Sequence, residues 1–420
     1  MDLKIYNGTD VLTAARERIA FTFDNFERVY VSFSAGKDST VMLHLVMDEA
    51  KKRNRKVGVL LVDLEAQYKK TIDHALNCVE MYKDLIDLHW VCLPIALRNA
   101  VSNFEPKWLC WDPENKENWV REMPKLESGL ISDPNFFPFF QSGMEFEEFV
   151  PEFDEWYAQG KSCACFIGIR TDESLNRFRT IALFDKKTFE GKRYTTKVTE
   201  NAFNIYPIYD WAVSDIWLYH FKFPAMPYNQ IYDYMFRAGL TPSQMRICQP
   251  YGDDQRRGLW LYHLLEPNTW YKVVSRVNGV NSGALYVQET GNITGYNKIT
   301  KPENHTWKSY CNLLLSTLPE KTRQHYIKRF RGFIEGWKGR GYSNGIPDEA
   351  PVVLENKHWA PSWRRLCKVL LRNDYWCKGL GLTQPKSEAY GKFLKIRNAN
   401  RAALKNDQSE NEESDDEIAS

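Results

Sequence analysis

Residues 29–39 read Val29-Tyr30-Val31-Ser32-Phe33-Ser34-Ala35-Gly36-Lys37-Asp38-Ser39, and this stretch decides the fold. The first five residues are mostly β-branched or aromatic, which predicts a short strand. A helix is expected over 40–52, because apolar residues recur there at helical spacing. The small polar residues in between allow the backbone to approach a ligand closely, and the start of the helix offers free N–H groups to phosphate oxygens. The sequence therefore predicts a phosphate-binding loop between a strand and a helix.

The segments that follow predict the rest of a sheet. Residues 57–62 form an almost continuous apolar run that ends at Asp63, as is typical of a parallel strand buried on both faces. A helix is expected over 68–82, and further strands over 88–93 and 164–169. This alternation predicts an α/β fold with a doubly wound, mainly parallel sheet, followed by a mostly helical C-terminal domain.

Composition divides the 420 residues into three predicted regions. Residues 1–260 are expected to form a nucleotide-binding α/β domain, with 101–160, which are crowded with Trp and Pro, as an insertion or lid. Residues 261–405 are expected to form a basic, aromatic and mostly helical domain, since 321–405 hold 19 Lys and Arg against 6 Asp and Glu. Residues 406–420 carry seven acids and no base, which predicts a disordered tail.

The overall composition narrows the class of protein. No apolar stretch reaches the roughly 18–20 residues of a membrane span, and the first residues do not resemble a secretory signal. The nine cysteines are scattered and odd in number, which argues against a disulfide framework. We therefore expect a cytoplasmic protein with no membrane partner. Since neither paired cysteines nor a Cys/His ligand spacing is present, no iron–sulfur cluster and no zinc site are expected.

Three segments resemble one known superfamily. Residues 31–39 are similar to the PP-loop, Ser-Gly-Gly-x-Asp-Ser/Thr, of the adenine nucleotide α-hydrolases, which include ATP pyrophosphatases and phosphoadenosine phosphosulfate (PAPS) reductase; a Walker P-loop pattern is absent. Ala35 replaces the first glycine of the motif, which is tolerable if its φ is negative. Residues 168–179 resemble the Gly-x-Arg-x-x-Glu-Ser…Arg segment of that superfamily, and residues 206–217 resemble its Pro-Ile-x-Asp-Trp element.

The resemblance implies a set of site residues. Lys37, Asp38 and Arg170 are the expected catalytic residues, and Asp38 is also a candidate ligand of Mg²⁺. The adenosine is expected at the end of the second strand, although an acid such as Asp63 can also be a simple turn former. The residues expected to bind the nucleotide are Ser32, Ser34, Ala35, Gly36, Lys37, Asp38, Ser39, Asp63, Leu64, Gly168, Arg170, Glu173 and Arg177.

The resemblance also implies the ligand and the reaction. ATP is the expected ligand, with PAPS or adenosine phosphosulfate (APS) as alternatives, and Mg²⁺ is expected with it. Most relatives cleave ATP between the α- and β-phosphates, so ATP pyrophosphatase activity or adenylyl transfer is the leading hypothesis. PAPS reduction is the weaker one, because the family's C-terminal Glu-Cys-Gly-x-His segment is absent. Cys163, Cys165 and Cys248 are then the candidate nucleophiles.

A smaller group within the superfamily matches nearly the full length. Residues 227–232, 246–258 and 361–367 resemble bacterial and phage PAPS reductase family proteins that carry a C-terminal domain of unknown function. The best-named member of this group is the immunoglobulin-binding regulator A protein, encoded beside a ParB-like regulator B. The resemblance implies a ParB-like partner protein and a regulatory or phage-defence role.

The basic C-terminal region suggests a non-catalytic alternative, a nucleotide-sensing transcriptional co-regulator that contacts DNA. Lys and Arg neutralise nucleic-acid phosphates, and interleaved aromatic rings can stack on bases. The same pattern is typical of a helical domain with an aromatic core and a solvated basic face, or of a surface that docks an acidic partner. The candidate nucleic-acid contacts are Arg323, Lys328, Arg329, Arg331, Arg364 and Arg365.

Overall fold

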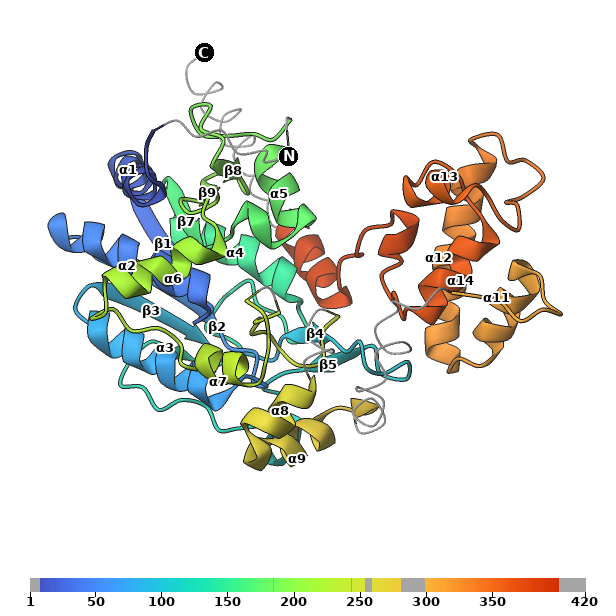
Figure 1. Ribbon diagram of the computed structural model, residues 1–420, viewed down its shortest axis with the longest axis horizontal. Coiled ribbons are helices and arrows are strands. Elements are labelled where there is room, and N and C mark those ends of the chain that lie inside the picture. Colours follow the sequence, from blue (N-terminus) through green and yellow to red (C-terminus); the bar gives the residue numbers. More distant parts are fainter. Residues whose placement is uncertain (1–7, 184, 243, 254–258, 281–298, 400–420) are drawn as a thin grey trace, which may run out of the picture.

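The computed structural model describes residues 8–183, 185–242, 244–253, 259–280 and 299–399 (Figure 1). The predicted acidic tail, 406–420, lies outside the described residues. Within these ranges, no helix is both long enough and apolar enough to cross a membrane.

A seven-stranded sheet forms the centre of the molecule, with the order β6-β3-β2-β1-β7-β9-β8. Every neighbouring pair is parallel except β8 with β9, which confirms the predicted doubly wound, mainly parallel sheet. The strands are β1 (Arg28–Ser32), β2 (Val57–Val62), β3 (Ile86–Val91), β6 (Leu130–Ile131), β7 (Cys163–Ile167), β8 (Thr195–Lys197) and β9 (Ala202–Ile205). The central strands are almost wholly buried, as their unbroken apolar runs require.

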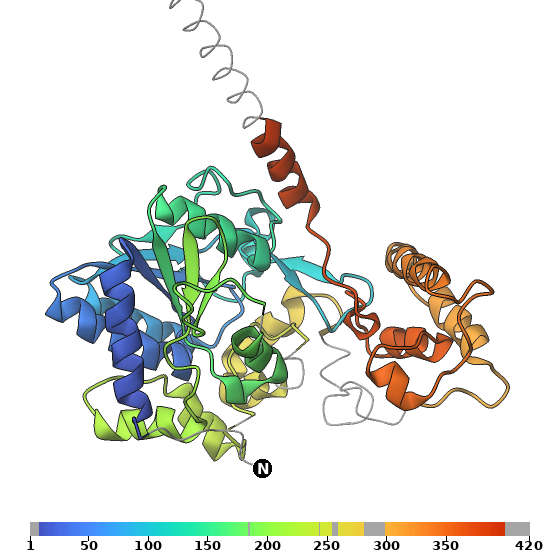
Figure 2. The same ribbon diagram turned by 90° about the horizontal axis from the view of Figure 1, so that it is seen from above.

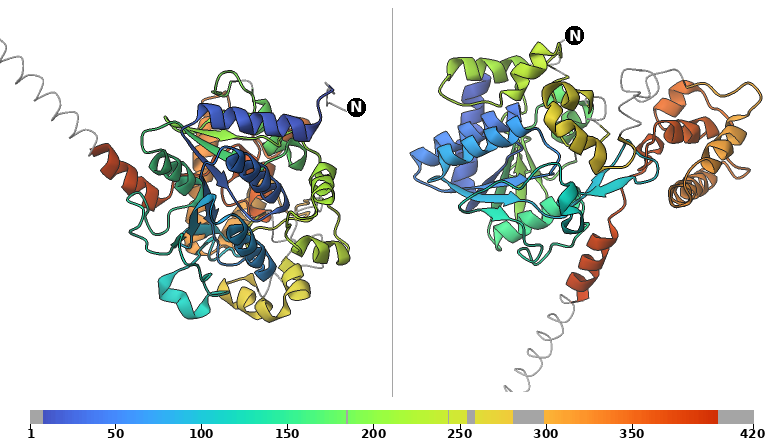
Figure 3. Two further views of the ribbon diagram at one scale, coloured as in Figure 1. Left: turned by 90° about the vertical axis from the view of Figure 1, so that its left-hand side faces the viewer. Right: turned by 90° about the horizontal axis from the view of Figure 1, so that it is seen from below.

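Helices cover both faces of the sheet (Figure 3). Helices α2 and α3 lie on one face, where α1 and α6 contact α2, and α4 packs against β7 and β9 on the other face. Their bounds are α1 (Val11–Asn25), α2 (Lys37–Lys52), α3 (Lys69–Tyr82), α4 (Phe146–Ala158), α5 (Leu175–Ala182), α6 (Val213–Lys222) and α7 (Ile231–Arg237). In α2, Asp38 lies in the first turn and Lys51 and Lys52 lie in the last, which matches the direction of the helix dipole.

The region predicted as an insertion, 101–160, does not form a single body. It begins beside a two-stranded hairpin of β4 (Ala96–Arg98) and β5 (Lys107–Leu109), continues through the 3-10 helix η1 (Pro113–Asn118), and ends with β6 and α4. Because β6 and α4 belong to the sheet and its helical layer, only the part between β4 and β6 lies outside the α/β pattern.

The C-terminal part is helical, as predicted, and has a hydrophobic cluster of its own (Figure 1). Its helices are α11 (Trp307–Ser316), α12 (Glu320–Lys338), α13 (Val352–Asn356), α14 (Trp363–Leu371) and the 3-10 helix η4 (Lys378–Leu380). Helices α8 (Leu259–Leu265) and α9 (Pro267–Arg276) instead pack into the main hydrophobic cluster with the sheet body. Residues 388–399 are again helical and return to the sheet body, where they lie against α4 (Figure 2). The domain boundaries 1–260 and 261–405 stay predictions.

Candidate functional site

A cavity of about 420 Å³ lies where the strand order reverses. The chain runs from β1 to β2 and β3 on one side and places β7 and β9 on the other, so the switch point of the sheet is between β1 and β7. In open α/β sheets, ligands bind beyond the carboxyl ends of the strands at this point. Ser32 at the end of β1 and Ile167 at the end of β7 both line the cavity, which is called the loop cavity below.

Residues 34–39 form one wall of the loop cavity and are held in place by a serine. The Oγ of Ser39 accepts hydrogen bonds from the backbone N–H groups of Ser34, at 3.3 Å, and Gly36, at 3.2 Å. It also lies 3.0 Å from the Oγ of Ser34. Helix α2 then begins at Lys37, with the Thr40 N–H donating to the Gly36 carbonyl at 2.9 Å. The structure therefore contains the predicted strand, loop and helix in succession, and the N-terminus of the helix lies at the cavity.

Ala35 does not have the negative φ under which an alanine would be tolerated at this position of the motif. Its φ is +56°, in the left-handed region that favours the glycine found there in relatives. This conformation costs a residue with a Cβ about 1–2 kcal/mol. The Asn229 side chain helps to hold it, because its Nδ2 donates to the Ala35 carbonyl at 3.0 Å.

Gly168 allows β7 and α2 to approach each other. A Cβ at this position would lie 3.0 Å from the backbone carbon and oxygen of Asp38 and from the Cα of Ser39. These are rigid backbone atoms, so the contact leaves little room for a methyl group. Gly168 therefore sets the distance between the first turn of α2 and the neighbouring strand.

Charged residues gather around the start of α2. The carboxylate of Asp38 binds the Lys37 Nζ at 2.9 Å and the Arg170 Nε at 2.5 Å. Arg177 binds the Glu173 carboxylate at 2.6 Å, and Arg246 donates to the Glu173 carbonyl at 3.1 Å. Four cations therefore accompany two carboxylates, and the free N–H groups of a helix start point to the same place. This arrangement favours an anion.

Nine of the thirteen predicted binding residues line the loop cavity. Arg170 does not, because its guanidinium is only 4% exposed and is bonded to Asp38 and to the Trp211 carbonyl. Ala35 is buried beneath the loop. The nine are Ser32, Ser34, Gly36, Lys37, Asp38, Ser39, Gly168, Glu173 and Arg177.

Asp63 and Leu64 lie outside the loop cavity. Asp63 is fully buried, and its carboxylate accepts hydrogen bonds from the Trp90 Nε1, at 2.9 Å, and from the Glu65 N–H, at 3.0 Å, besides an ion pair with Arg121. These partners leave no open face for a ribose and instead tie β2 to β3 and to the segment that follows β5. The geometry favours the structural reading of Asp63, the alternative weighed in the sequence.

Several residues of the site were not identified in the sequence. The Tyr232 Oη accepts the Lys37 N–H at 3.1 Å, and burial raises the pKa of Tyr232, which therefore stays protonated. Arg246 and Cys248 line the loop cavity, and Phe146 and Val150 of α4 form its apolar wall with Ile247. A signal for Tyr232 and Arg246 was present, since both lie in segments that resemble the family, 227–232 and 246–258, whereas Cys248 was predicted only as a candidate nucleophile.

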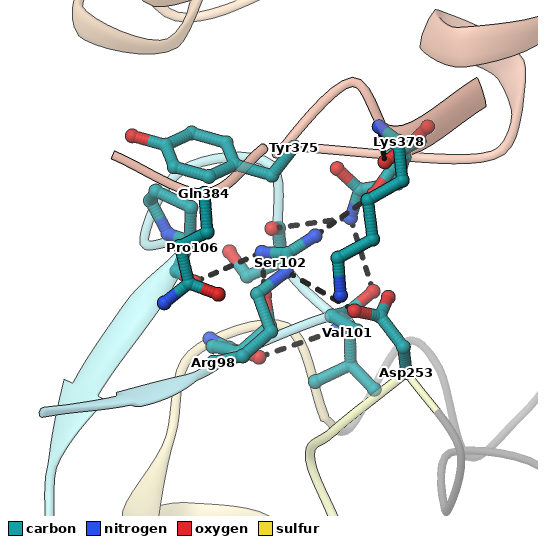
Figure 4. A network of polar contacts seen from close by, with 12 residues as sticks. Arg98, Val101, Ser102, Pro106, Asp253, Tyr375, Lys378 and Gln384 are labelled. Atoms are coloured by element: carbon teal, nitrogen blue, oxygen red, sulfur yellow. Dashed lines mark hydrogen bonds and ion pairs between the residues drawn. The ribbon is translucent and has the colours of Figure 1, made fainter. Parts of the chain in front are cut away.

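A second cavity, of about 650 Å³, adjoins the loop cavity. The two share Phe146 and Cys248 as lining residues, and Leu64 lines the second one. Its walls come from the β4–β5 hairpin, the start of α4, residues 248–253 and residues 372–384. Figure 4 shows part of this wall, where Arg98 donates to the Pro106 carbonyl at 2.9 Å and lies over the Tyr375 ring, 5.2 Å from its centre.

Two protein-family models match the chain. Residues 28–238 match the phosphoadenosine phosphosulfate reductase domain, and residues 239–347 match a domain of unknown function, DUF3440. The chain belongs to the PAPS reductase domain family. It is 42% identical over 393 residues to the uncharacterized protein YbdN of Escherichia coli, covering 93% of this chain and 95% of that protein.

Two solved structures are similar at a more distant level. One is the PAPS reductase of Candida auris in a phosphate complex, with a TM-score of 0.28 and 13% identity, covering 53% of this chain and 84% of that one. The other is the U34-tRNA thiolase NcsA of Methanococcus maripaludis with its [4Fe-4S] cluster, with a TM-score of 0.32 and 13% identity, covering 72% and 88%.

The predictions about the metal ion and the iron–sulfur cluster were wrong. Asp38, the expected Mg²⁺ ligand, has both carboxylate oxygens bound to cations, and no group of three or more His, Cys, Asp or Glu among the described residues could hold a metal ion. The exclusion of an iron–sulfur cluster on cysteine spacing is withdrawn; one of the compared structures, the thiolase NcsA, is described with a [4Fe-4S] cluster.

Proposed function

We propose that this protein binds an adenine nucleotide in the loop cavity and directs chemistry to its α-phosphate. The observation that carries the proposal is the joint position of residues 34–39, the N-terminus of α2 and the Lys37 ammonium on one cavity at the switch point of the sheet. Backbone N–H groups and cations in this arrangement match a chain of phosphates. The apolar wall of Phe146, Val150 and Ile247 suits the adenine ring.

The reaction that fits the site is displacement at the α-phosphorus of ATP. An acceptor oxygen or nitrogen forms a bond to the α-phosphorus, the bond from that phosphorus to the bridging oxygen breaks, and pyrophosphate leaves with the electron pair. The acceptor's proton passes to solvent. Lys37 and the N–H groups of α2 stabilise the negative charge that builds up on the phosphate oxygens. Arg170 acts as a positioning residue, because it holds Asp38, which in turn holds Lys37.

The second cavity supplies room for the acceptor. It adjoins the loop cavity at Phe146 and Cys248 and is lined largely by polar and charged side chains, among them Arg98, Glu147 and Gln249. With water as the acceptor, the products are AMP and pyrophosphate. With a molecule bound in the second cavity, the product is an adenylate.

Calorimetric titration with ATP, APS and PAPS tests the proposal, together with assays of AMP and pyrophosphate. Lys37→Ala is expected to weaken ATP binding by about tenfold or more, because it removes a charge-assisted contact to phosphate. Lys52→Ala is the matched control, since Lys52 ends the same helix with its side chain 63% exposed. The proposal fails if the wild-type protein binds none of the three nucleotides, or if Lys37→Ala and Lys52→Ala bind ATP equally well.

A second candidate function, the nucleotide-sensing regulator that contacts DNA, is favoured by one specific observation. The side chains of Lys321, Lys328, Arg331 and Lys338 are exposed and recur at helical spacing along α12. Such a row can follow a phosphate backbone. The ParB-like partner and the regulatory or phage-defence setting belong to either proposal and rest on the sequence resemblance alone.

A further inference from the structure

Helix α4 carries a stripe of buried carboxylates. Glu145 precedes its first residue, and Glu148 and Glu152 follow at spacings of three and four, which places all three on one side of the helix. Each is buried in the folded chain. Carboxylates in such a position need hydrogen-bond or ionic partners, because burial without them costs several kcal/mol.

The end of the chain supplies a partner for each of them, and Glu145 also pairs with Lys107 of β5. We call residues 384–397 the C-terminal clasp. The Gln384 amide donates to Glu145, and the Ser387 N–H and Oγ both donate to Glu148 at 2.5 Å. Glu152 accepts from the Tyr390 Oη at 2.6 Å and binds the Arg397 Nη1 through both oxygens at 2.8 Å. The spacing of donors along the clasp therefore matches the spacing of acceptors along α4.

The other sides of α4 connect this contact to the site. Phe149 and Phe153 are buried in the main hydrophobic cluster, while Phe146 and Val150 line the loop cavity. Helix α4 contacts the clasp, the hydrophobic core and the loop cavity through different sides. A change in how the clasp holds α4 therefore shifts the apolar wall of the cavity. Glu145 and Gln384 also line the second cavity, so the clasp contributes to that cavity as well as to the contact with α4.

We propose that the C-terminal clasp positions α4 as a wall of the nucleotide site, so that release of the clasp lowers nucleotide affinity. The inference rests on the proposed function in that it takes the loop cavity as the nucleotide site. The clasp follows the C-terminal helical part directly, since η4 ends at Leu380. A partner that displaces that helical part therefore acts on the nucleotide site through the clasp.

The test uses the full-length chain with Tyr390→Phe and Arg397→Ala combined, which removes the partners of Glu152. The dissociation constant for ATP is expected to rise about tenfold, and amide hydrogen exchange of residues 146–158 is expected to accelerate. The control, Lys392→Ala with Lys395→Ala, removes two charges from the exposed side of the same helix and is expected to change neither quantity. Arg397→Lys in the Tyr390→Phe background is expected to restore most of the affinity, because it restores the charge.

The outcomes separate the two proposals. Failure of the wild-type chain to bind ATP would overturn the proposed function itself. If the wild-type chain binds ATP, and the double variant has faster exchange in α4 but unchanged affinity, the clasp is only a structural contact and the inference is wrong. Should the double variant unfold, the milder Ser387→Ala decides the question by the same two measurements, with unchanged affinity again counting against the inference.

Discussion

Two small residues determine the backbone of the phosphate-binding loop at the residue scale. Gly168 brings β7 within van der Waals contact of the first turn of α2, and Ala35 adopts a left-handed conformation just before that turn. The N–H groups of Ser34, Gly36 and Lys37 donate to Ser39 and Tyr232, so the loop offers a ligand the N–H groups of Asp38 and Ser39, and their direction depends on both positions. Affinity for an anion therefore depends on backbone placement as much as on Lys37.

Gly168→Ala is expected to weaken ATP binding by at least tenfold, because the added methyl pushes α2 away from β7 by several tenths of an ångström. Calorimetric titration measures this. Gly332→Ala is the control: Gly332 lies inside α12 with no atom near its missing Cβ, so this change should leave binding unaltered and stabilise the chain by about 0.5–1 kcal/mol. Equal ATP affinity in the two variants would show that the close approach at Gly168 does not matter for binding.

Motif spacing selected thirteen residues, and nine of them line one cavity. Lys37, Gly168 and Arg177 lie within short motifs, and the structure of such a motif depends mostly on residues that are close in sequence. The geometry does not favour the ribose contact expected of Asp63, because its carboxylate is buried against Trp90 and Arg121, which come from segments 27 and 58 positions away. A pattern around residue 63 contains no information about those partners.

At the element scale, α2, α3 and α6 pack around three buried histidines. His44 lies between the Tyr82 hydroxyl, at 2.7 Å, and the Pro227 carbonyl, at 2.9 Å, while the His74 Nε2 lies 2.9 Å from the Thr40 Oγ1. Burial lowers the pKa of His74 and of His220 to about 4, and it also lowers the pKa of His44. Helix α2 begins directly after the loop, and α3 and α6 contact α2, so the packing of these helices affects the position of the loop.

The three histidines predict a loss of stability in mild acid. The unfolded chain binds their protons below pH about 6.5, whereas folded His74 and His220 bind them only near pH 4, so the free energy of unfolding falls as the pH falls between these values. Each contributes up to about 1.4 kcal/mol per pH unit. Asp154, whose pKa burial raises to about 7, acts in the opposite direction.

Urea denaturation at pH 7 and pH 5 isolates the histidine contribution. His220→Gln is expected to lose less stability between the two pH values than the wild-type chain, by about 1–2 kcal/mol. His263→Gln, at an exposed position of α8, is expected to behave like the wild type. Identical pH dependence in all three proteins would contradict the role assigned to the buried histidines.

The elements themselves were largely predictable, because their apolar patterns are long. The run at 57–62 coincides with β2, but the strand expected at 88–93 lies at Ile86–Val91, since Cys92 and Leu93 are buried without belonging to the strand. The two-residue β6 has no pattern of its own. Its position depends on pairing with β3.

At the scale of the whole molecule, the basic C-terminal region divides into buried and exposed charges. Arg364 binds Glu349 and Glu355, and Arg365 donates to the Ala360 and Gly379 carbonyls, so both hold the helical part together. Arg329 does the same through the Trp376 carbonyl. Lys328 and Arg331 are exposed on α12. Of the six predicted nucleic-acid contacts, these two are best placed for a phosphate backbone.

The regulator alternative therefore predicts that Lys328→Ala with Arg331→Ala weakens binding to duplex DNA and lowers the salt slope by about 2, with little effect on stability. Arg364→Ala is expected to lower stability instead, by about 1.5–3 kcal/mol, because the buried Glu355 loses the hydrogen bonds of Arg364 and keeps Lys368 as its remaining cation. Gel-shift titration over a series of salt concentrations, with urea denaturation alongside, checks both. A DNA affinity that does not vary with salt would exclude this alternative.

Composition predicted the basic, helical character of the C-terminal region but not its contact with α4. The clasp binds residues about 239 positions earlier in the chain, and neither partner segment has an unusual local pattern. Long-range pairing of this kind depends on the complete fold. The same holds for the second cavity, where residues 372–384 lie next to the loop cavity.

The protection of Cys248 by ATP tests the central claim most directly. All nine cysteines lie in the described part of the chain, eight are buried, and Cys248 alone is partly exposed, where it lines the loop cavity. Cys248 also lines the second cavity, so alkylation of the native protein reports on both cavities, and the comparison with Lys37→Ala assigns any protection to the loop cavity. We predict that saturating ATP slows the alkylation of Cys248 severalfold in the wild-type chain and much less in Lys37→Ala. Binding of ATP with no change in the alkylation rate would show that the nucleotide lies elsewhere.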